Sequence, residues 1–332
     1  MQMVTAQRFP GPLAAVESAG VHLADDLDLV EQALRAVVRD ADNAFISSAA
    51  GHLIDAGGKR FRPMMALLGA HFGPSRTQIV EAAAMTELVH VATLYHDDVM
   101  DEAPVRHGVI TANARWSNTI AVLLGDYLLA RAAELGAGLG DAVLKLQLGT
   151  LRRLVRGQVN ETVGPLDGVD RSGHCLRVMS DKSASLIAMA VRLGAMVSGA
   201  DEHVARCLEL YGELLGTAFQ ISDDVLDIAA TEAELGKKPG TDLREGIVTL
   251  PVLYAVEDDP ALADVVLAGP ITDDDCRAFA LELLRPSAGL RRARQEVVRY
   301  AERARDMLHD IPDIPARAAL SALCDFVAVR TS

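Results

Sequence analysis

Apolar residues recur along most of this chain at the three- and four-residue spacing of an amphipathic α-helix. Val and Ile are scattered through this spacing and do not alternate with polar residues, as they would in half-buried strands. Clusters of Gly, Pro or Asp separate the periodic segments, as at residues 73–74 and 164–165. The pattern therefore predicts an all-α protein. The predicted helices span residues 24–38, 43–56, 61–72, 77–103, 111–138, 141–163, 173–199, 201–230, 247–258, 272–284, 288–309 and 315–330.

The chain shows no change of composition that would mark a linker between domains, and no low-complexity tract. We therefore expect residues 1–332 to form a single helical domain. Residues 1–20 are expected to be an irregular arm, because Pro10, Gly11 and Pro12 would interrupt an early helix.

Composition excludes several classes of protein. The formal net charge of −14 argues against a nucleic-acid partner held by a general positive field. The four cysteines are widely separated, so neither a disulfide framework nor a zinc site is expected. The chain begins without the basic and apolar segments of a signal peptide, and no apolar run reaches the roughly 20 residues that span a bilayer. We expect a cytoplasmic protein without a membrane span.

Two acidic clusters of the same form are the most informative feature. They read D-D-V-M-D at residues 97–101 and D-D-V-L-D at residues 223–227, and each follows a long apolar helical segment. A single cluster of this kind is most often a solvated helix end. Two copies with identical aspartate spacing are harder to explain in that way, so we interpret them as one functional unit.

Helical spacing indicates what the clusters do. Residues four apart share a helix face, so Asp97 and Asp101 point together, as do Asp223 and Asp227. Carboxylates this close repel one another unless a cation lies between them. Magnesium prefers oxygen ligands and often joins a few carboxylates to substrate phosphates. The clusters therefore predict a magnesium site that holds a phosphate-bearing ligand.

Basic residues near the clusters could contact the phosphate oxygens that no metal holds. The segment G-G-K-R-F-R-P at residues 57–63 concentrates three cations beside two glycines. Arg106 follows the first cluster by five residues, and Lys237 and Lys238 follow the second by ten or more. A basic surface loop is the alternative interpretation of each segment taken alone.

These segments together resemble the trans-type (all-E) polyprenyl diphosphate synthases, over roughly residues 45–255. The resemblance implies an antiparallel helical bundle around a central cavity, assembled as a homodimer. It implies a magnesium-dependent prenyltransferase, with three ions per active site, that condenses an allylic diphosphate with isopentenyl diphosphate and makes a linear all-trans polyprenyl diphosphate. The segments that carry it are residues 57–63, 87–90, 97–106, 157–158, 182–184, 219–224 and 236–242.

The resemblance also implies roles for individual residues. Its catalytic set is Asp97, Asp98, Asp101, Lys182, Gln220, Asp223 and Asp224. Its metal-binding set is Asp97, Asp101 and Asp223, with Asp227 added to it, while Asp98 and Asp224 are additional acids. Arg106, Lys182 and Lys237 would hold the allylic diphosphate, and Lys59, Arg62 and His90 would hold isopentenyl diphosphate. Ser183 and Gln220 would border the reacting carbons.

One position departs from the family pattern. The family commonly has two arginines before Gly108, whereas this chain has Arg106 followed by His107. A neutral imidazole would bind the diphosphate of isopentenyl diphosphate less well than a second arginine. Alternatively, Lys59 and Arg62 suffice without it.

Product length is expected to depend on the helix that leads into Asp97. The fourth and fifth residues before this aspartate are Thr93 and Ala92, both small, where short-chain members of the family commonly place aromatic rings. A ring there would close the cavity about one helical turn from the metals, so its absence favours about six to ten isoprene units. Alternatively, Ala92 packs against a neighbour and another helix supplies the floor.

Other functions remain open from the sequence. A class I terpene cyclase also ionises allylic diphosphates, but its second metal motif normally mixes Asn, Ser or Thr with Glu. Head-to-head condensing synthases of the squalene type use D-x-x-x-D motifs. A regulatory subunit of a heteromeric synthase would be favoured by loss of one acidic cluster, and this chain has both.

Overall fold

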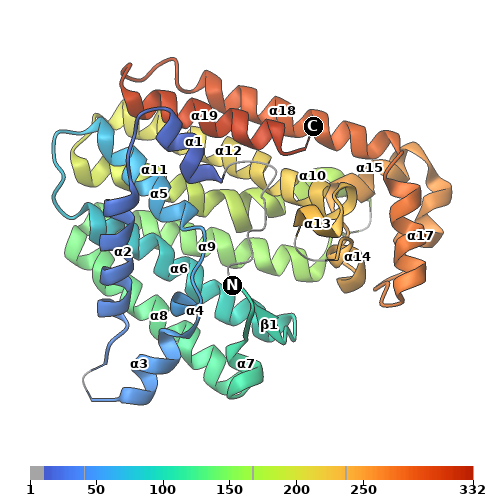
Figure 1. Ribbon diagram of the computed structural model, residues 1–332, viewed down its shortest axis with the longest axis horizontal. Coiled ribbons are helices and arrows are strands. Elements are labelled where there is room, and N and C mark those ends of the chain that lie inside the picture. Colours follow the sequence, from blue (N-terminus) through green and yellow to red (C-terminus); the bar gives the residue numbers. More distant parts are fainter. Residues whose placement is uncertain (1–10, 41, 167, 236–237, 332) are drawn as a thin grey trace.

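The computed structural model describes residues 11–40, 42–166, 168–235 and 238–331. Within them the chain is almost entirely helical, with one two-stranded hairpin, which confirms the all-α prediction (Figure 1). The N-terminal half contains α1 (Pro12–Ser18), α2 (Ala24–Val37), α3 (Ala44–Ala50), α4 (His52–Asp55), α5 (Phe61–Gly69), the 3₁₀ turn η1 (Ala70–Phe72), α6 (Ile79–Met100), β1 (Val105–Arg106), β2 (Val109–Ile110), α7 (Ala112–Arg115), α8 (Asn118–Leu139) and α9 (Asp141–Val163). The C-terminal half contains α10 (Arg171–Met179), the π-helical turn η2 (Ser180–Ala184), α11 (Ser185–Ser198), α12 (Glu202–Ala229), α13 (Glu232–Leu235), α14 (Thr241–Glu245), α15 (Leu250–Asp258), the 3₁₀ turn η3 (Pro260–Leu262), α16 (Ala263–Val266), α17 (Asp274–Leu284), α18 (Ala288–Asp306) and α19 (Pro315–Val329).

Helix α6, which carries the first acidic cluster, lies in the interior. Its residues from Ala82 to Val89 are all buried, which is the pattern of a helix covered on every side. Helices α2, α5, α8 and α11 pack around it. The end that carries Asp97 and Asp101 is therefore held by neighbours on several sides.

Helix α12, which carries the second acidic cluster, is joined to α6 through α11. Helix α11 packs against both, and α18 and α19 cover α12 along the upper edge of the view (Figure 1). Buried apolar side chains form one continuous cluster that extends from Val16 to Val327. This shared core joins helices from both halves of the described chain, and the single domain stays a prediction.

The predicted irregular arm is wrong for part of its length. Residues 12–18 form α1, with Gly11 as the residue that precedes the helix and Pro12 at its first position. Proline suits this position because its missing N–H would have no helical partner there and its φ angle already fits a helix. Pro12, which indicated a break, therefore marks a helix start, and α1 packs against α19.

Two other differences lie close to the acidic clusters. The predicted helix over residues 173–199 is interrupted by η2, so α10 and α11 are separate segments. The stretch between α6 and α7 forms a short antiparallel hairpin in which Arg106 pairs with Val109. Neither feature has a periodic apolar pattern, because each is too short to show one.

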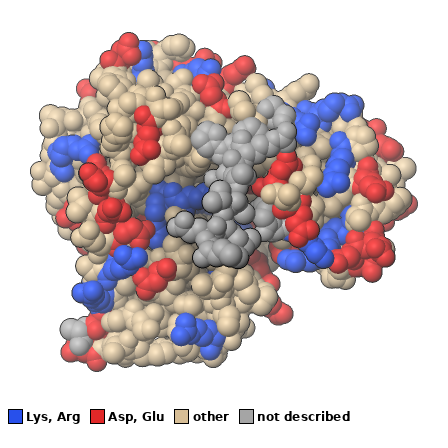
Figure 2. Space-filling model, viewed as in Figure 1, with Lys and Arg blue, Asp and Glu red and all other residues tan. Residues whose placement is uncertain are grey.

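Within the described ranges, no helix combines the length and the apolar character needed to cross a bilayer. The four cysteines are free. On the face drawn in Figure 2, acidic and basic side chains are interspersed and do not form one continuous basic surface.

Candidate active site

A cavity of about 810 Å³ lies between the two acidic clusters. Asp97 and Asp101 from α6 and Asp224 from α12 contribute to its wall. Because α6 and α12 are far apart in the sequence, only the packing of both helices on α11 brings these carboxylates to one space. The other polar residues that line it are Arg106, Glu161, Arg171, His174, Lys182, Ser183, Gln220, Asp242 and Thr249.

The carboxylates of Asp97 and Asp101 lie in an environment that favours a cation. They are placed in the last turn of α6 and at its end, where the helix dipole is negative and disfavours a further negative charge. Burial raises the pKa of Asp97, and the charge of Asp101 raises it further while Lys182 lowers it. Burial likewise raises the pKa of Asp101. A divalent cation would remove these costs.

Asp98 points away from the cavity and serves Arg106. Its side chain is fully buried, and Arg106 Nε donates a hydrogen bond of 2.5 Å to Asp98 Oδ1. Asn113 Nδ2 donates to the Asp98 carbonyl at 3.0 Å. The hairpin after α6 thus folds back over the helix end, and Asp98 holds Arg106 at the cavity wall.

The aspartates of the second acidic cluster contact different partners. Asp224 lines the cavity, and its Oδ1 accepts a hydrogen bond of 3.0 Å from Gln220 Nε2. Burial raises the pKa of Asp224 well above its usual range, and Asp242 adds to the effect. Asp223 forms an ion pair of 2.6 Å with Arg330.

Asp227 is engaged by the loop that follows α12. Its Oδ2 accepts a hydrogen bond of 3.0 Å from the Asp242 N–H, and its carbonyl accepts one of 2.8 Å from Gly240. This contact brings Asp242 to the cavity wall. Of the predicted metal-binding set, the structure therefore brings Asp97 and Asp101 into the cavity and directs Asp223 and Asp227 to other partners.

The donor set fits magnesium better than a metal that needs a complete protein cage. Within the described residues, no three or more His, Cys, Asp and Glu side chains converge to hold a metal ion by themselves. Magnesium usually retains waters and is held by one or two carboxylates together with substrate phosphates. The neighbouring carboxylates of Asp97 and Asp101 are such a pair, with Asp224 and Asp242 lining the same cavity.

Lys182 and Ser183 enter the cavity from η2. Lys182 Nζ forms an ion pair of 2.5 Å with Glu161 at the cavity wall. Ser183 Oγ donates a hydrogen bond of 2.9 Å to Gln220 Oε1. Ser183, Gln220 and Asp224 thus form a hydrogen-bonded chain between η2 and α12.

A second basic cluster, made of Arg62, His90, Arg106 and His107, extends from the cavity. Burial lowers the pKa of His90 well below its usual value, and the charges of Arg62, His107 and Arg106 lower it further. Burial also lowers the pKa of Arg62, whose buried Nε has no hydrogen-bond partner among the residues that the structure describes. Buried cationic donors without acceptors are costly, so this cluster is suited to an anionic ligand.

Arg60, close to this cluster in the sequence, forms hydrogen bonds within the protein. Its guanidinium donates to Glu87 Oε1 at 3.0 Å and to the Ile54 carbonyl at 2.8 Å, and it also contacts Glu31. These bonds fasten the loop that carries Lys59, whose side chain is exposed. Lys237 lies outside the described residues.

Sequence reasoning missed Glu161 and Asp242, which both line the cavity. Asp242 belonged to a segment that carried the resemblance, but no role was assigned to it. Glu161 lies on α9 among charged residues of helical spacing, where nothing local distinguishes it from a solvated side chain.

Comparisons with known proteins agree with this geometry. A family model described as polyprenyl synthetase matches residues 43–278. The nonaprenyl diphosphate synthase of Mycobacterium tuberculosis is 46% identical over 306 residues, which is 91% of each chain. A polyprenyl synthase from Caulobacter crescentus, solved with calcium and isoprenyl diphosphate, superposes with a TM-score of 0.87 at 32% identity and covers 98% of this chain and 100% of its own.

A geranylgeranyl pyrophosphate synthase from Corynebacterium glutamicum, also solved with calcium and isoprenyl diphosphate, gives a TM-score of 0.84 at 42% identity. The match covers 93% of this chain and 96% of that one. The family model and the 46% identical relative each cover most of the sequence. The chain therefore belongs to the polyprenyl synthetase family.

Proposed function

We propose that this protein condenses an allylic diphosphate with isopentenyl diphosphate and releases a linear all-trans polyprenyl diphosphate of medium to long chain. The observation that carries this proposal is the shared cavity. Carboxylates from two helices, Asp97 and Asp101 from one and Asp224 from the other, line it together with the cations Arg106 and Lys182. Such a cavity suits a diphosphate held between metal ions and basic side chains.

The proposed reaction gives roles to several of the polar groups that line the cavity. Arg106 and Lys182 bind oxygens of the allylic diphosphate, whose carbon–oxygen bond breaks so that the electron pair leaves with the diphosphate. Magnesium held by Asp97 and Asp101 would neutralise the charge that develops on this leaving group. The hydroxyl of Ser183 and the amide of Gln220 stabilise positive charge on the allylic carbons through their oxygens.

The second substrate binds at the second basic cluster, together with Lys59. Arg62, His90 and Lys59 hold the diphosphate of isopentenyl diphosphate, whose double bond attacks the allylic cation. A proton is then lost, and the released diphosphate is the base that the family resemblance implies. The buried, unsatisfied Nε of Arg62 favours condensation over cyclisation, because a cyclase needs no second diphosphate site.

A product-forming assay tests this proposal. The purified chain is incubated with magnesium, farnesyl diphosphate and labelled isopentenyl diphosphate, and the products are separated by chromatography. We expect a longer linear diphosphate that disappears with EDTA and in an Asp97→Asn, Asp101→Asn double variant. Asp141→Asn, at the exposed start of α9, is the matched control. A cyclic hydrocarbon, or inactivity without a partner subunit, would contradict the proposal.

We also propose that the metal is magnesium, with three ions per active site. Support comes from the oxygen donors of Asp97, Asp101, Asp224 and Asp242 around one cavity. Titration of the protein with magnesium and inorganic diphosphate, followed by calorimetry, measures the number of ions. A stoichiometry other than three would contradict the proposed number. That the protein is cytoplasmic stays a prediction.

A homodimer is proposed from apolar residues that α8 and α9 expose. Val122 and Leu123 on α8, and Leu148, Val155 and Val159 on α9, are between 40% and 58% exposed. Contiguous exposed apolar surface often marks a protein interface. Analytical ultracentrifugation should give a dimer for the wild type and for Val298→Glu on α18, and a monomer for Val159→Glu. A dimeric Val159→Glu variant would contradict this interface.

A further inference from the structure

The π-turn η2, residues 180–184, presents two site residues, Lys182 and Ser183, to the cavity. Its wider hydrogen bond runs from the Ser185 N–H to the Ser180 carbonyl, five residues back. An extra residue in a π-turn rotates everything that follows by about 100° relative to a continuous α-helix. Lys182 and Ser183 line the cavity, whereas the preceding Asp181 is buried toward α9.

Side chains of Arg153 and Ser185 hold two backbone carbonyls of the π-turn. Arg153 on α9 donates from Nη2 to the Ser180 carbonyl at 3.3 Å and to Ser180 Oγ at 3.0 Å. Ser185 Oγ donates to the Asp181 carbonyl at 2.7 Å. The Ser180 carbonyl thus has a side-chain donor besides the Ser185 N–H, and the Asp181 carbonyl has a side-chain donor as well, so these contacts help to hold the wider turn in place.

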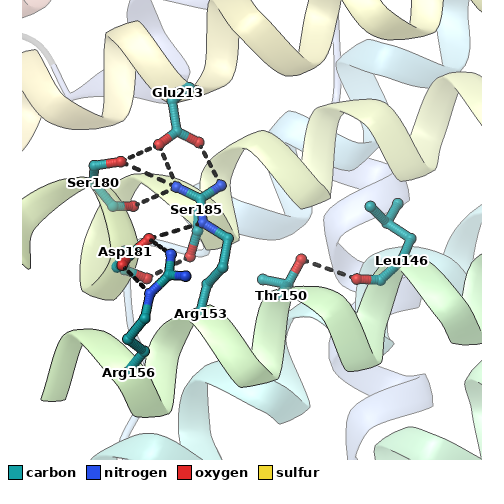
Figure 3. A network of polar contacts seen from close by, with 8 residues as sticks. All are labelled: Leu146, Thr150, Arg153, Arg156, Ser180, Asp181, Ser185 and Glu213. Atoms are coloured by element: carbon teal, nitrogen blue, oxygen red, sulfur yellow. Dashed lines mark hydrogen bonds and ion pairs between the residues drawn. The ribbon is translucent and has the colours of Figure 1, made fainter. Parts of the chain in front are cut away.

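A network of four charges fastens the π-turn to α9 and α12 (Figure 3). Asp181 accepts hydrogen bonds from Arg153 Nε at 3.0 Å and from Arg156 Nε at 2.7 Å. On its other side Arg153 donates to both carboxylate oxygens of Glu213 on α12, at 2.9 and 2.6 Å. Arg153 is therefore the residue that joins all three elements.

Close helix contacts leave the π-turn little room to move. A Cβ added to Gly157 on α9 would lie 2.8 Å from the backbone nitrogen of Lys182. A Cβ added to Gly216 on α12 would lie 2.7 Å from the Ala184 Cα. Glu213 and Gln220 are seven residues apart and share one face of α12, so the charge network lies two turns from the Ser183–Gln220 hydrogen bond.

We propose that Arg153 and Asp181 are positioning residues, which hold the π-turn so that Lys182 and Ser183 face the diphosphate. The proposal rests on the proposed function and deepens it, because it assigns a task to the segment around Gly157 that the reaction itself does not use. The competing explanation is that the network only stabilises the fold.

Kinetics and binding separate these two explanations. In Arg153→Met and Asp181→Asn, we expect the KM for the allylic diphosphate to rise about tenfold, as for loss of a charge-assisted contact. The KM for isopentenyl diphosphate should change less than about twofold, because its site lies on other elements. Arg153→Lys should recover part of the loss. Lys145→Met, which removes an exposed ion pair of the same helix, is the matched control.

A double-mutant cycle gives the decisive test. If Arg153 acts through Lys182, then Arg153→Met should have little further effect in a Lys182→Met background. The same cycle is measured with magnesium and inorganic diphosphate by calorimetry, so it does not depend on turnover. Effects of Arg153→Met and Lys182→Met that multiply, or a lower Tm with unchanged diphosphate affinity, would overturn the proposal.

Each failure has its own signature. Should Arg153→Met fail to fold, Asp181→Asn gives the same readouts with a side chain of the same shape. Absence of prenyl transfer in the wild type would contradict the proposed function. An active wild type in which the effects of Arg153→Met and Lys182→Met multiply would contradict the positioning role alone.

Discussion

Arg330 and Asp223 are 107 positions apart in the sequence, yet the Arg330 guanidinium donates to Asp223 Oδ1 at 2.6 Å. The same guanidinium lies 4.6 Å from the centre of the Phe219 ring, one turn earlier on α12. The end of α19 thus holds the first aspartate of the second acidic cluster, a residue that sequence reasoning assigned to magnesium.

Release of this contact should change metal binding. In Arg330→Gln, Asp223 no longer has its ion-pair partner, so we expect a lower magnesium concentration for half-maximal thermal stabilisation in the presence of inorganic diphosphate. Without ligands, the variant should be less stable by about 1 kcal/mol. Arg303→Gln on α18 is the control. An unchanged or higher magnesium requirement would show that Asp223 does not turn toward the metals.

The departure at His107 leads to a second prediction. His107 is an exposed residue of the hairpin turn with a φ of 50°, close enough to His90 to lower its pKa. His107→Arg places a permanent positive charge within the second basic cluster. We expect the KM for isopentenyl diphosphate to fall about two- to fivefold, the range of an exposed charge pair. His107→Gln should not lower it, and an unchanged KM in His107→Arg would remove this explanation.

Product length should respond to Ala92. Its side chain is fully buried on α6, whereas Thr93 is only partly buried. We expect Ala92→Phe to shorten the product, because a ring about one helical turn from the metals would block the growing tail. The added volume should also cost about 1–3 kcal/mol of stability. Thr93→Val, which keeps the side-chain shape, is the control for chromatography of the products. An unaltered distribution would indicate that another helix supplies the floor.

The Asp181 contacts should lose their effect in acid. Burial acts to raise the pKa of Asp181, but hydrogen bonds from Arg156 and Arg153 outweigh it and lower this pKa. A carboxyl whose pKa is lowered on folding stabilises the fold fully at a pH above its pKa in the unfolded state, which is about 4. This contribution is lost as the pH falls through its pKa in the folded state.

Asp181→Asn should therefore reduce the free energy of unfolding by about 1–3 kcal/mol at pH 7, and this difference should shrink as the pH falls below about 4. Urea unfolding of wild type and variant at several pH values measures it. A difference that stays constant down to pH 3 would mean that the charge of Asp181 is unimportant.

Much of the architecture was predictable because helical periodicity is a local property. The long helices α6, α9 and α12 agree with their predicted ranges within a few residues, whereas the predicted helix over residues 111–138 is divided into α7 and α8. The missed elements had weaker local signals: α1 begins at a proline that was taken as a break, and η2 differs from an α-helix by one inserted residue. For the candidate site, residue type and spacing indicated a diphosphate and metal ions, and the family resemblance is confirmed by the family model.

Sequence alone determined that acids recur at helical spacing after apolar segments and that cations follow them, because these are properties of neighbouring residues. Only the tertiary structure decided which acids share the cavity. Asp224 lines it while Asp223 meets Arg330 and Asp227 holds the loop at Asp242, because the direction of each α12 face depends on its packing against α11, α18 and α19. The pairing of Arg153 with Asp181 and Glu213 was likewise decided by packing, since 28 and 60 positions separate these residues along the chain.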